Sequence, residues 1–181
     1  PRRHKLCVSG LPQERKIPKI EDIRTQFINC AAMETHFAWH KYITGKKEAQ
    51  EELKGGKIPD DFLRSMKYTF GDYRDIFFGT DISSCGKIKN ASNTIKSKLV
   101  DITKNQKGDK LIEDNEKHKE WWEKHGHEIW RGMLCALTKD VKEIHKETEI
   151  ENTYSYENLK KPTNGTPSLE DFAKKPQFLR W

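Results

Sequence analysis

The chain has 181 residues, which is enough for one domain with a substantial core. Hydrophobic and charged residues make up 34% each, which indicates a polar, helix-leaning protein, and five Trp, eight Phe and five Tyr exclude outright disorder because they can fill a core. The formal net charge of +6 points to a polyanionic partner such as nucleic acid, a sulfated sugar or an acidic membrane, unless the charge serves solubility alone.

The first half of the chain reads as a series of helices. Residues 1–19 are basic and interrupted by two prolines, so we expect an extended lead-in. An apolar stripe with acidic residues in its first turn predicts a helix over 20–42, and a short charged helix is expected over 46–54. Apolar residues then repeat every three or four positions over 60–78, which predicts one more helix that Gly79 ends.

The second half alternates between irregular and helical patterns. Residues 83–109 are rich in Ser, Asn, Gly and Lys and read as a lysine-rich loop region that contains no more than a short amphipathic helix. The last strong helix begins after Lys110 and runs to about Lys146, with Gly126 able to kink it. Residues 148–181 form a polar, irregular tail. We therefore expect a single all-α domain, a helical bundle with long irregular loops, whose helical core comprises residues 20–82 and 110–147.

Neither end of the chain resembles a targeting or membrane segment. The N-terminus, PRRHKLCVSG, lacks the apolar core of a signal peptide and begins without Met, so we expect a fragment of a longer chain. No apolar run approaches the roughly 20 residues that span a bilayer, so no membrane insertion is expected.

Four cysteines allow three pairings, and the sequence does not choose among them. This number is not disulfide-dense for the length, so composition leaves the redox compartment open. The absence of Cys-x-x-Cys spacing argues against a zinc knuckle. The disulfide candidates are Cys7, Cys30, Cys85 and Cys135.

The stretch YTFGDYRDIFFGTDI, residues 68–82, favours architecture over catalysis. Asp72 and Asp75 are three apart and share one side of a mostly buried helix, where a like-charged pair needs a basic partner or backbone donors. We therefore expect an ion-pair network that ties this helix to another. The residues assigned to structural roles are Phe70, Asp72, Tyr73, Arg74, Asp75, Trp122 and Trp130.

Motifs for an enzyme or a bound cofactor are absent from the sequence. There is no Gly-x-Ser-x-Gly, no phosphate-cradling loop and no dinucleotide fingerprint. His36 and His40 share a helix face at the spacing of metal ligands, but no third ligand is indicated, so they are read as ordinary histidines. We expect no catalysis, no cofactor and no metal.

The best functional candidates are lysines. Spaced ammonium groups suit the sulfates or phosphates of an extended polymer, although a solvated mobile loop would show the same composition. Nucleic acid is disfavoured because the lysine-rich region lacks arginines, stacking aromatics and a helix-turn-helix signal. The candidate binding residues are Lys87, Lys89, Lys96 and Lys98, with Lys46 and Lys47 as additions.

Five sequence blocks in order resemble one known family. They are PRRHKLC at 1–7, INCAAMETHFAWHKY at 28–42, IPDDFLRSMKYTFGDYRDIFFGTDI at 58–82, WWEKHGHEIWRGMLCAL at 121–137 and PQFLRW at 176–181. Together they resemble the middle part of a Duffy-binding-like domain from the variant erythrocyte membrane protein 1 adhesins of malaria parasites. The Ala-Ala-x-Glu-Thr and Ile-Pro-x-x-Phe blocks are most similar to the gamma, delta or epsilon classes.

This resemblance implies a mainly helical adhesin domain that does not catalyse a reaction. It implies display outside the infected red cell, as part of a larger membrane-anchored protein with further adhesin domains, and an oxidising setting in which disulfides form. It also implies a host receptor as partner. The lysines favour a sulfated glycosaminoglycan, chondroitin sulfate A first; the alternatives are a receptor protein, such as intercellular adhesion molecule 1 or platelet–endothelial cell adhesion molecule, and, more distantly, nucleic acid. The family's flanking cysteine-rich subdomains are missing, so a receptor site within them would be missing too.

Overall fold

A computed structural model describes residues 6–11, 19–103, 110–162 and 165–180. Within these ranges every regular element is a helix, so the predicted all-α fold is confirmed. The three helices predicted in the first half are present as α1 (Ile20–Tyr42), α2 (Lys47–Lys54) and α3 (Asp60–Phe78). The lead-in prediction falls largely on residues outside the described ranges.

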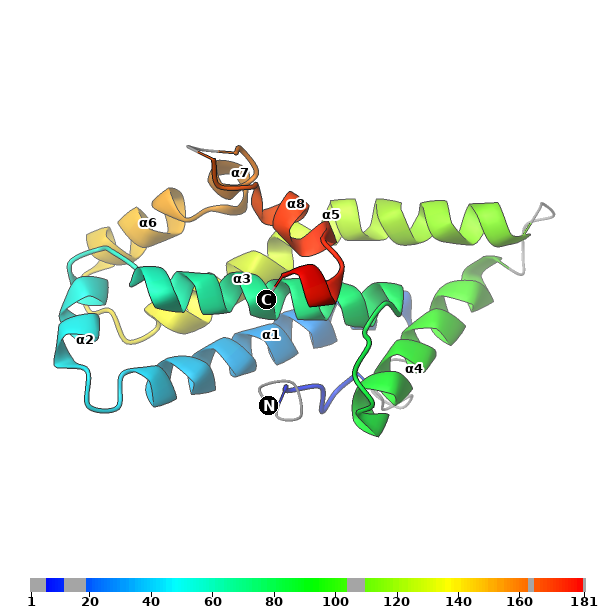
Figure 1. The fold of residues 1–181 in the computed structure, drawn as a ribbon, viewed down its shortest axis with the longest axis horizontal. Coiled ribbons are helices and arrows are strands. Elements are labelled where there is room, and N and C mark those ends of the chain that lie inside the picture. The colour runs from blue at the N-terminus through cyan, green and yellow to red at the C-terminus, as the bar shows by residue number, and fades with distance from the viewer. Residues whose placement is uncertain (1–5, 12–18, 104–109, 163–164, 181) are drawn as a thin grey trace.

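Two long helices form the frame of the molecule. Helix α1 packs along α5 (Lys110–Thr138), and this is the most extensive contact between any two elements of the described chain. Helix α3 runs beside them and also contacts α4 (Gly86–Thr103), as Figure 1 shows. The helices α2 and α4 lie at opposite ends of this frame.

Aromatic rings from α1, α3 and α5 fill the core between these helices. The ring of Phe77 stacks on Trp121 with centroids 4.5 Å apart, and Phe27 meets both Tyr73 and Phe77 edge-on at 6.1 and 5.8 Å. Such edge-to-face and offset pairs stabilise a core by about 0.5–1.5 kcal/mol each beyond the burial of their surface. The stripe predicted on α3 therefore forms the centre of the fold.

Helix α3 ends where the sequence predicts. Gly79 has φ 67°, the left-handed conformation that a residue without Cβ adopts at little cost, and the Thr80 N–H donates to the Asp75 carbonyl at 2.9 Å. A side chain at residue 79 would also collide with the stem of Lys96, whose Cε would be 2.4 Å from an added Cβ. The left-handed backbone therefore requires the glycine, whereas the flexible end of the Lys96 side chain can move away from an added Cβ.

The prediction of a loop over 83–109 is wrong for most of its length, because α4 is an 18-residue helix. One face of this helix is buried at three- and four-residue spacing, and the Ser92 hydroxyl on that face donates to the Ile76 carbonyl at 2.9 Å. The small polar residues that suggested a loop occupy mainly the solvent side. The buried residues are Ile88, Ala91, Ser92, Ile95 and Leu99.

The last part of the chain is also more ordered than expected. Helix α5 runs through Gly126 without a break but ends at Thr138, short of the predicted Lys146. After this end the chain turns, and the Val141 N–H donates to the Thr138 carbonyl at 2.8 Å. The tail expected to be irregular contains α6 (Ile144–Thr153), α7 (Tyr156–Leu159), α8 (Leu169–Lys174) and the short 3-10 helix η3 (Gln177–Leu179). Helices α8 and η3 pack on α3 (Figure 1), because Leu169 and Ala173 supply a buried apolar face.

Candidate functional site

The four lysines predicted between residues 87 and 98 do not share one side of α4. At 3.6 residues per turn, Lys87 and Lys98 lie within about 20° of each other, and Lys89 and Lys96 do so on the opposite side. The buried face lies between the two pairs, so each pair borders it along one edge. Lys87, Lys89 and Lys96 are exposed and Lys98 is half-buried.

The two additional lysines lie elsewhere. Lys46 is the N-cap of α2 and Lys47 its first residue, at the end of the molecule far from α4 (Figure 1). The Lys46 ammonium lies 4.0 Å from the centre of the Tyr42 ring, a cation–π contact. The six candidate lysines therefore form three separate pairs rather than one cluster.

The acidic pair on α3 has a basic partner from the end of the chain. Arg180 Nη2 donates to Asp75 Oδ2 and lies 3.6 Å from Asp72 Oδ1, and all three side chains are almost fully buried. Nη1 of the same guanidinium donates to the carbonyls of Ala173 and Lys175 at 2.8 and 3.2 Å. Burial raises the pKa of Asp75, and the hydrogen bond from Arg180 opposes that rise.

Arg74 joins a different network from its two aspartate neighbours. Its guanidinium lies over the Phe78 ring at 4.4 Å and its Nε is 4.0 Å from Glu170 Oε2. The other oxygen of Glu170 accepts hydrogen bonds from Tyr156 Oη at 2.5 Å and Trp122 Nε1 at 3.2 Å. Burial lowers the pKa of Arg74 and raises that of Tyr156. The contacts of Glu170 with Arg74, Trp122 and Tyr156 join α8 to α3, α5 and α7.

The remaining residues assigned to structural roles lie in the core. Phe70, Tyr73, Trp122 and Trp130 are each exposed by no more than 3%. The Tyr73 hydroxyl donates to the Cys7 carbonyl at 2.7 Å, and Trp130 Nε1 donates to the Tyr154 carbonyl at 2.8 Å. Both polar groups are thus satisfied within the core, as buried donors must be.

All four disulfide candidates are thiols in this structure, but two of them are in contact. The Cys7 side chain forms a hydrogen bond with Cys30, and this contact is the main cause that lowers the pKa of Cys7 to about 5. The N–H of Cys7 donates to Glu34 Oε2 at 2.9 Å, which fixes the N-terminal segment against α1. Cys85 is half-buried and Cys135 is exposed.

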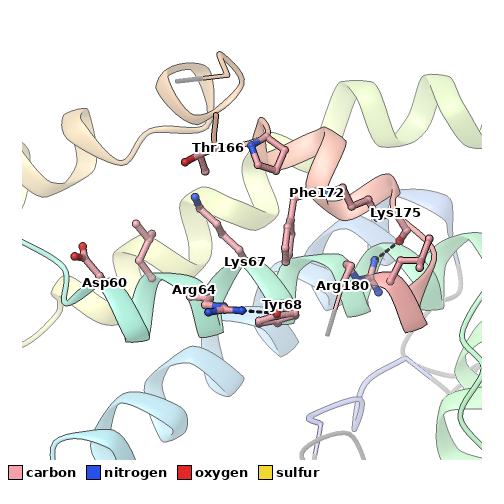
Figure 2. A pocket seen from close by; sticks show the side chains of 11 residues that line it. Asp60, Arg64, Lys67, Tyr68, Thr166, Phe172, Lys175 and Arg180 are labelled. Atoms are coloured by element: carbon pink, nitrogen blue, oxygen red, sulfur yellow. Dashed lines mark hydrogen bonds between the residues drawn. The ribbon is translucent and has the colours of Figure 1, made fainter. Parts of the chain in front are cut away.

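A cavity of about 520 Å³ lies between α3, α8 and the C-terminal turn, which consists of η3 and Arg180. Figure 2 shows Lys67 rising from α3 towards Thr166, and Phe172 reaching from α8 towards Tyr68. Basic groups dominate its wall, since Asp60 is the one acidic side chain among the described residues that line it. The basic lining residues are Arg64, Lys67, Lys175 and Arg180.

Sequence reasoning did not identify this cavity. Its α3 residues were visible as a polar row beside the apolar stripe, at positions 60, 64, 67 and 68. Its other wall comes from residues about 100 positions later, in a tail that was expected to be irregular. Only the fold brings the two walls together.

The structure also bears on metal binding and membrane insertion. Over the described part of the chain, no group of three or more His, Cys, Asp or Glu is arranged to hold a metal ion. The His36 and His40 rings are 4.3 Å apart, and His40 Nε2 lies 3.6 Å from Asp140 Oδ2. Among the helices of the described residues, none is both long and apolar enough to cross a membrane.

Comparison with known proteins places this architecture in a family. The family model described as the Duffy binding domain matches residues 1–180. The chain is 28% identical over 91 residues to the Duffy receptor of Plasmodium vivax (strain Salvador I), a match that covers 50% of this chain and 8% of that protein. It is 22% identical over 183 residues to the Duffy receptor gamma form of Plasmodium knowlesi, covering 99% of this chain and 14% of that protein.

The chain thus spans a small part of the length of either relative, and no solved structure matches it. The family model nevertheless covers nearly every residue, including the α3 block and the C-terminal Phe-Leu-Arg segment that the ion-pair network joins. The chain therefore belongs to the Duffy binding domain family.

Proposed function

We propose that this chain is a cell-adhesion module of a parasite surface antigen and that it binds a host-cell receptor. The match of the Duffy binding domain family over residues 1–180 is the observation that carries this proposal, since that family consists of receptor-binding domains and not of enzymes. The sequence blocks further support an origin in the variant erythrocyte membrane protein 1 adhesins, displayed on the infected red cell beside other domains of the same protein.

The proposed ligand is a sulfated glycosaminoglycan, chondroitin sulfate A first. The net charge of +6 and the exposed lysines of α4 support a polyanion. A linear polymer that lies along α4 would meet one edge at a time. Lys89 and Lys96 are two turns apart, about 10 Å along the axis, whereas Lys87 and Lys98 are about 16 Å apart. Lys89 and Lys96 are closer together and both are exposed, so they are the better contact for successive sulfates.

This ligand is tested by measuring binding to immobilised chondroitin sulfate A over a range of salt concentrations. Binding should weaken steeply as salt rises, because lysine contacts release counterions and are screened. Replacing Lys89 and Lys96 together by Met should weaken binding at least tenfold, and replacing Lys87 and Lys98 should have a smaller effect. The glycosaminoglycan proposal is rejected if binding does not change with salt concentration, or if both double variants bind as tightly as the unmodified chain.

A protein receptor is the second candidate, and an exposed apolar pair favours it. Met33 and Phe37 are exposed by 45% and 63%, and their spacing places them on one side of α1. An interface with intercellular adhesion molecule 1 or platelet–endothelial cell adhesion molecule could bury both side chains. Binding to a purified receptor ectodomain that survives glycosaminoglycan-degrading enzymes and is lost in Phe37→Ser would favour this candidate over the first.

A further inference from the structure

The cavity between α3, α8 and the C-terminal turn has more basic than acidic side chains among the described residues that line it. Arg180 is neutralised by Asp72 and Asp75 behind the wall, as described above. Lys67 and Lys175 line the cavity without such a counter-charge, since neither ammonium forms an ion pair with any described residue. The cavity is therefore a positively charged site in which no described residue neutralises Lys67 or Lys175.

Lys67 is the residue that most strongly indicates an anion-binding site. Its side chain is half-buried, and burial lowers its pKa, which means that the protein environment disfavours the charged ammonium. Folded proteins normally pair a partly buried ammonium with a carboxylate, because desolvating an unpaired charge is costly. An anion placed in the cavity would supply the missing partner.

Part of the cavity wall beside Lys67 is aromatic. Tyr68 and Phe172 meet edge-on, with ring centres 5.2 Å apart and an angle of 71° between the planes. The Arg64 guanidinium lies 5.8 Å from the centre of the Tyr68 ring and donates from Nη2 to its hydroxyl at 3.4 Å, which holds the tyrosine in place. Figure 2 shows these rings beside the Lys67 stem, so an apolar surface and a cation face the same space.

We propose that this cavity binds a small organic anion, namely a single sulfate or carboxylate carried on a ring. The acidic group would pair with Lys67, with Lys175 adding to the positive field, and the ring would pack on Tyr68 and Phe172. A cavity of about 520 Å³ falls within the range of about 300–1,000 Å³ that small-molecule sites occupy. The same chemistry is carried by an acidic sugar unit and by an aromatic acid.

This site is distinct from the α4 edge and goes beyond the proposed receptor binding. The test titrates the isotope-labelled chain with N-acetylglucosamine 6-sulfate, glucuronate and phenyl sulfate while backbone amide signals are followed by NMR. N-acetylglucosamine and inorganic sulfate serve as neutral and ringless probes. Lys67→Met keeps the apolar stem but removes the charge, and Lys139→Met, at an exposed position of the turn after α5, is the matched control.

At least one ring-bearing acid should shift the amides of residues 64–68 and 172–175 in a saturable way, more tightly than inorganic sulfate or the neutral sugar. Lys67→Met should weaken that binding at least tenfold and Lys139→Met should leave it unchanged. Tighter binding of the sugar acids than of phenyl sulfate identifies a saccharide source, and the reverse identifies an aromatic acid.

The proposal is overturned if no saturable shift occurs at those residues. It is also overturned if the neutral sugar or inorganic sulfate binds equally well, or if Lys67→Met binds the acids as tightly as the unmodified chain does. Chondroitin sulfate binding through α4 should be the same in Lys67→Met, so the two proposals can fail independently.

Discussion

Arg180 lies buried against Asp75, a residue 105 positions earlier in the chain, and this pair joins the C-terminal turn to the middle of α3. Asp72 lies on the same side of the guanidinium, and Ala173 and Lys175 accept its other hydrogen bonds. The like-charged aspartates of α3 can remain buried because a single arginine places its positive charge next to both.

Replacing Arg180 by Met should lower the free energy of unfolding by about 3–5 kcal/mol, because it removes the buried cation that lies next to both carboxylates. The loss should be smaller near pH 4 than at pH 7. A carboxyl whose folded pKa lies above its unfolded value destabilises the fold only where it is ionised, and the pKa of Asp75 is already raised by burial. Urea unfolding at both pH values measures the loss of unfolding free energy.

The control is Arg131→Met, at an exposed site, which should change the free energy of unfolding by no more than about 0.5 kcal/mol. Equal losses in both variants, or a larger loss at pH 4, would contradict the assignment.

Gly71 makes room for the same arginine. An added Cβ would lie 3.0 Å from Nη1 and 3.1 Å from Cζ of Arg180, whose guanidinium is held in place by the hydrogen bonds from Nη1 and Nη2. Gly71→Ala should therefore destabilise the fold by about 1–3 kcal/mol, although alanine is ordinarily the better helix residue by about 1 kcal/mol.

A double-mutant cycle separates these two effects. In the Arg180→Met background, the flexible methionine can yield, and Gly71→Ala should become neutral or stabilising. Gly86→Ala is the matched control, since nothing lies within 4 Å of a Cβ at that position. Additive effects in the cycle would show that the guanidinium does not set the requirement for glycine.

Glu128 links α5 to α1 through a two-pronged contact with Arg24, whose Nε and Nη2 donate to its two oxygens at 2.5 Å each. These hydrogen bonds lower the pKa of Glu128 to about 2. A carboxyl with a depressed folded pKa stabilises the fold above its unfolded pKa of about 4.3, and that contribution is lost as the pH falls towards 2. Because Arg24 is 45% exposed, Glu128→Gln should cost only about 1 kcal/mol at pH 7 and almost nothing at pH 2. Thermal unfolding between pH 2 and 7 measures the difference, with Glu120→Gln as the control; a constant difference across this range would rule out the contact.

A proline substitution in α4 tests whether residues 86–103 form a helix. Asn93 lies on the exposed side of α4, where a loop would accept proline and a helix would lose a hydrogen bond and about 3 kcal/mol. Asn93→Pro should therefore lower both the urea midpoint and the helical signal in circular dichroism, and Asn93→Ala should be neutral or slightly stabilising because alanine is the better helix residue. If the two variants unfold at the same midpoint, the segment is not helical there.

The contrast between α3 and α4 shows what the sequence could predict. Helix α3 has large aromatic residues on its buried face and a glycine at its end, so periodicity alone predicts its bounds. Helix α4 buries the same kind of stripe at Ile88, Ile95 and Leu99, but small polar residues and lysines outnumber them. The composition of this segment therefore indicates a loop although its spacing is helical.

The long-range partners could not be predicted for a physical reason. A buried acidic pair requires a cation, and Asp72 and Asp75 indicated that one exists, but nothing local shows that it is Arg180 rather than Arg74 between them. The cavity beside Lys67 is likewise formed by two segments that only the packing of α8 on α3 brings together. The lysines of α4 were identified as a group by composition, and the helix separates them into two edges.

Oxidation should join Cys7 to Cys30. Their side chains are hydrogen-bonded to each other, and this contact lowers the pKa of Cys7 to about 5, which favours the reactive thiolate. With oxidised glutathione, the thiolate of Cys7 would displace one glutathione, and the Cys30 thiolate would then displace the second. The two cysteine sulfurs would thereby lose two electrons and two protons to form the bond, leaving two reduced glutathione molecules.

Peptide mapping by mass spectrometry should find the Cys7–Cys30 link in the oxidised chain. The oxidised chain should be more stable than the reduced one by about 2–4 kcal/mol, because the bond closes a loop from the N-terminal segment to α1. The Cys85→Ser, Cys135→Ser double variant should retain this difference and Cys30→Ser should lose it. A link from Cys7 to Cys85 or Cys135, or a chain whose stability does not change on oxidation, would show that the contact between Cys7 and Cys30 is not the site of the disulfide.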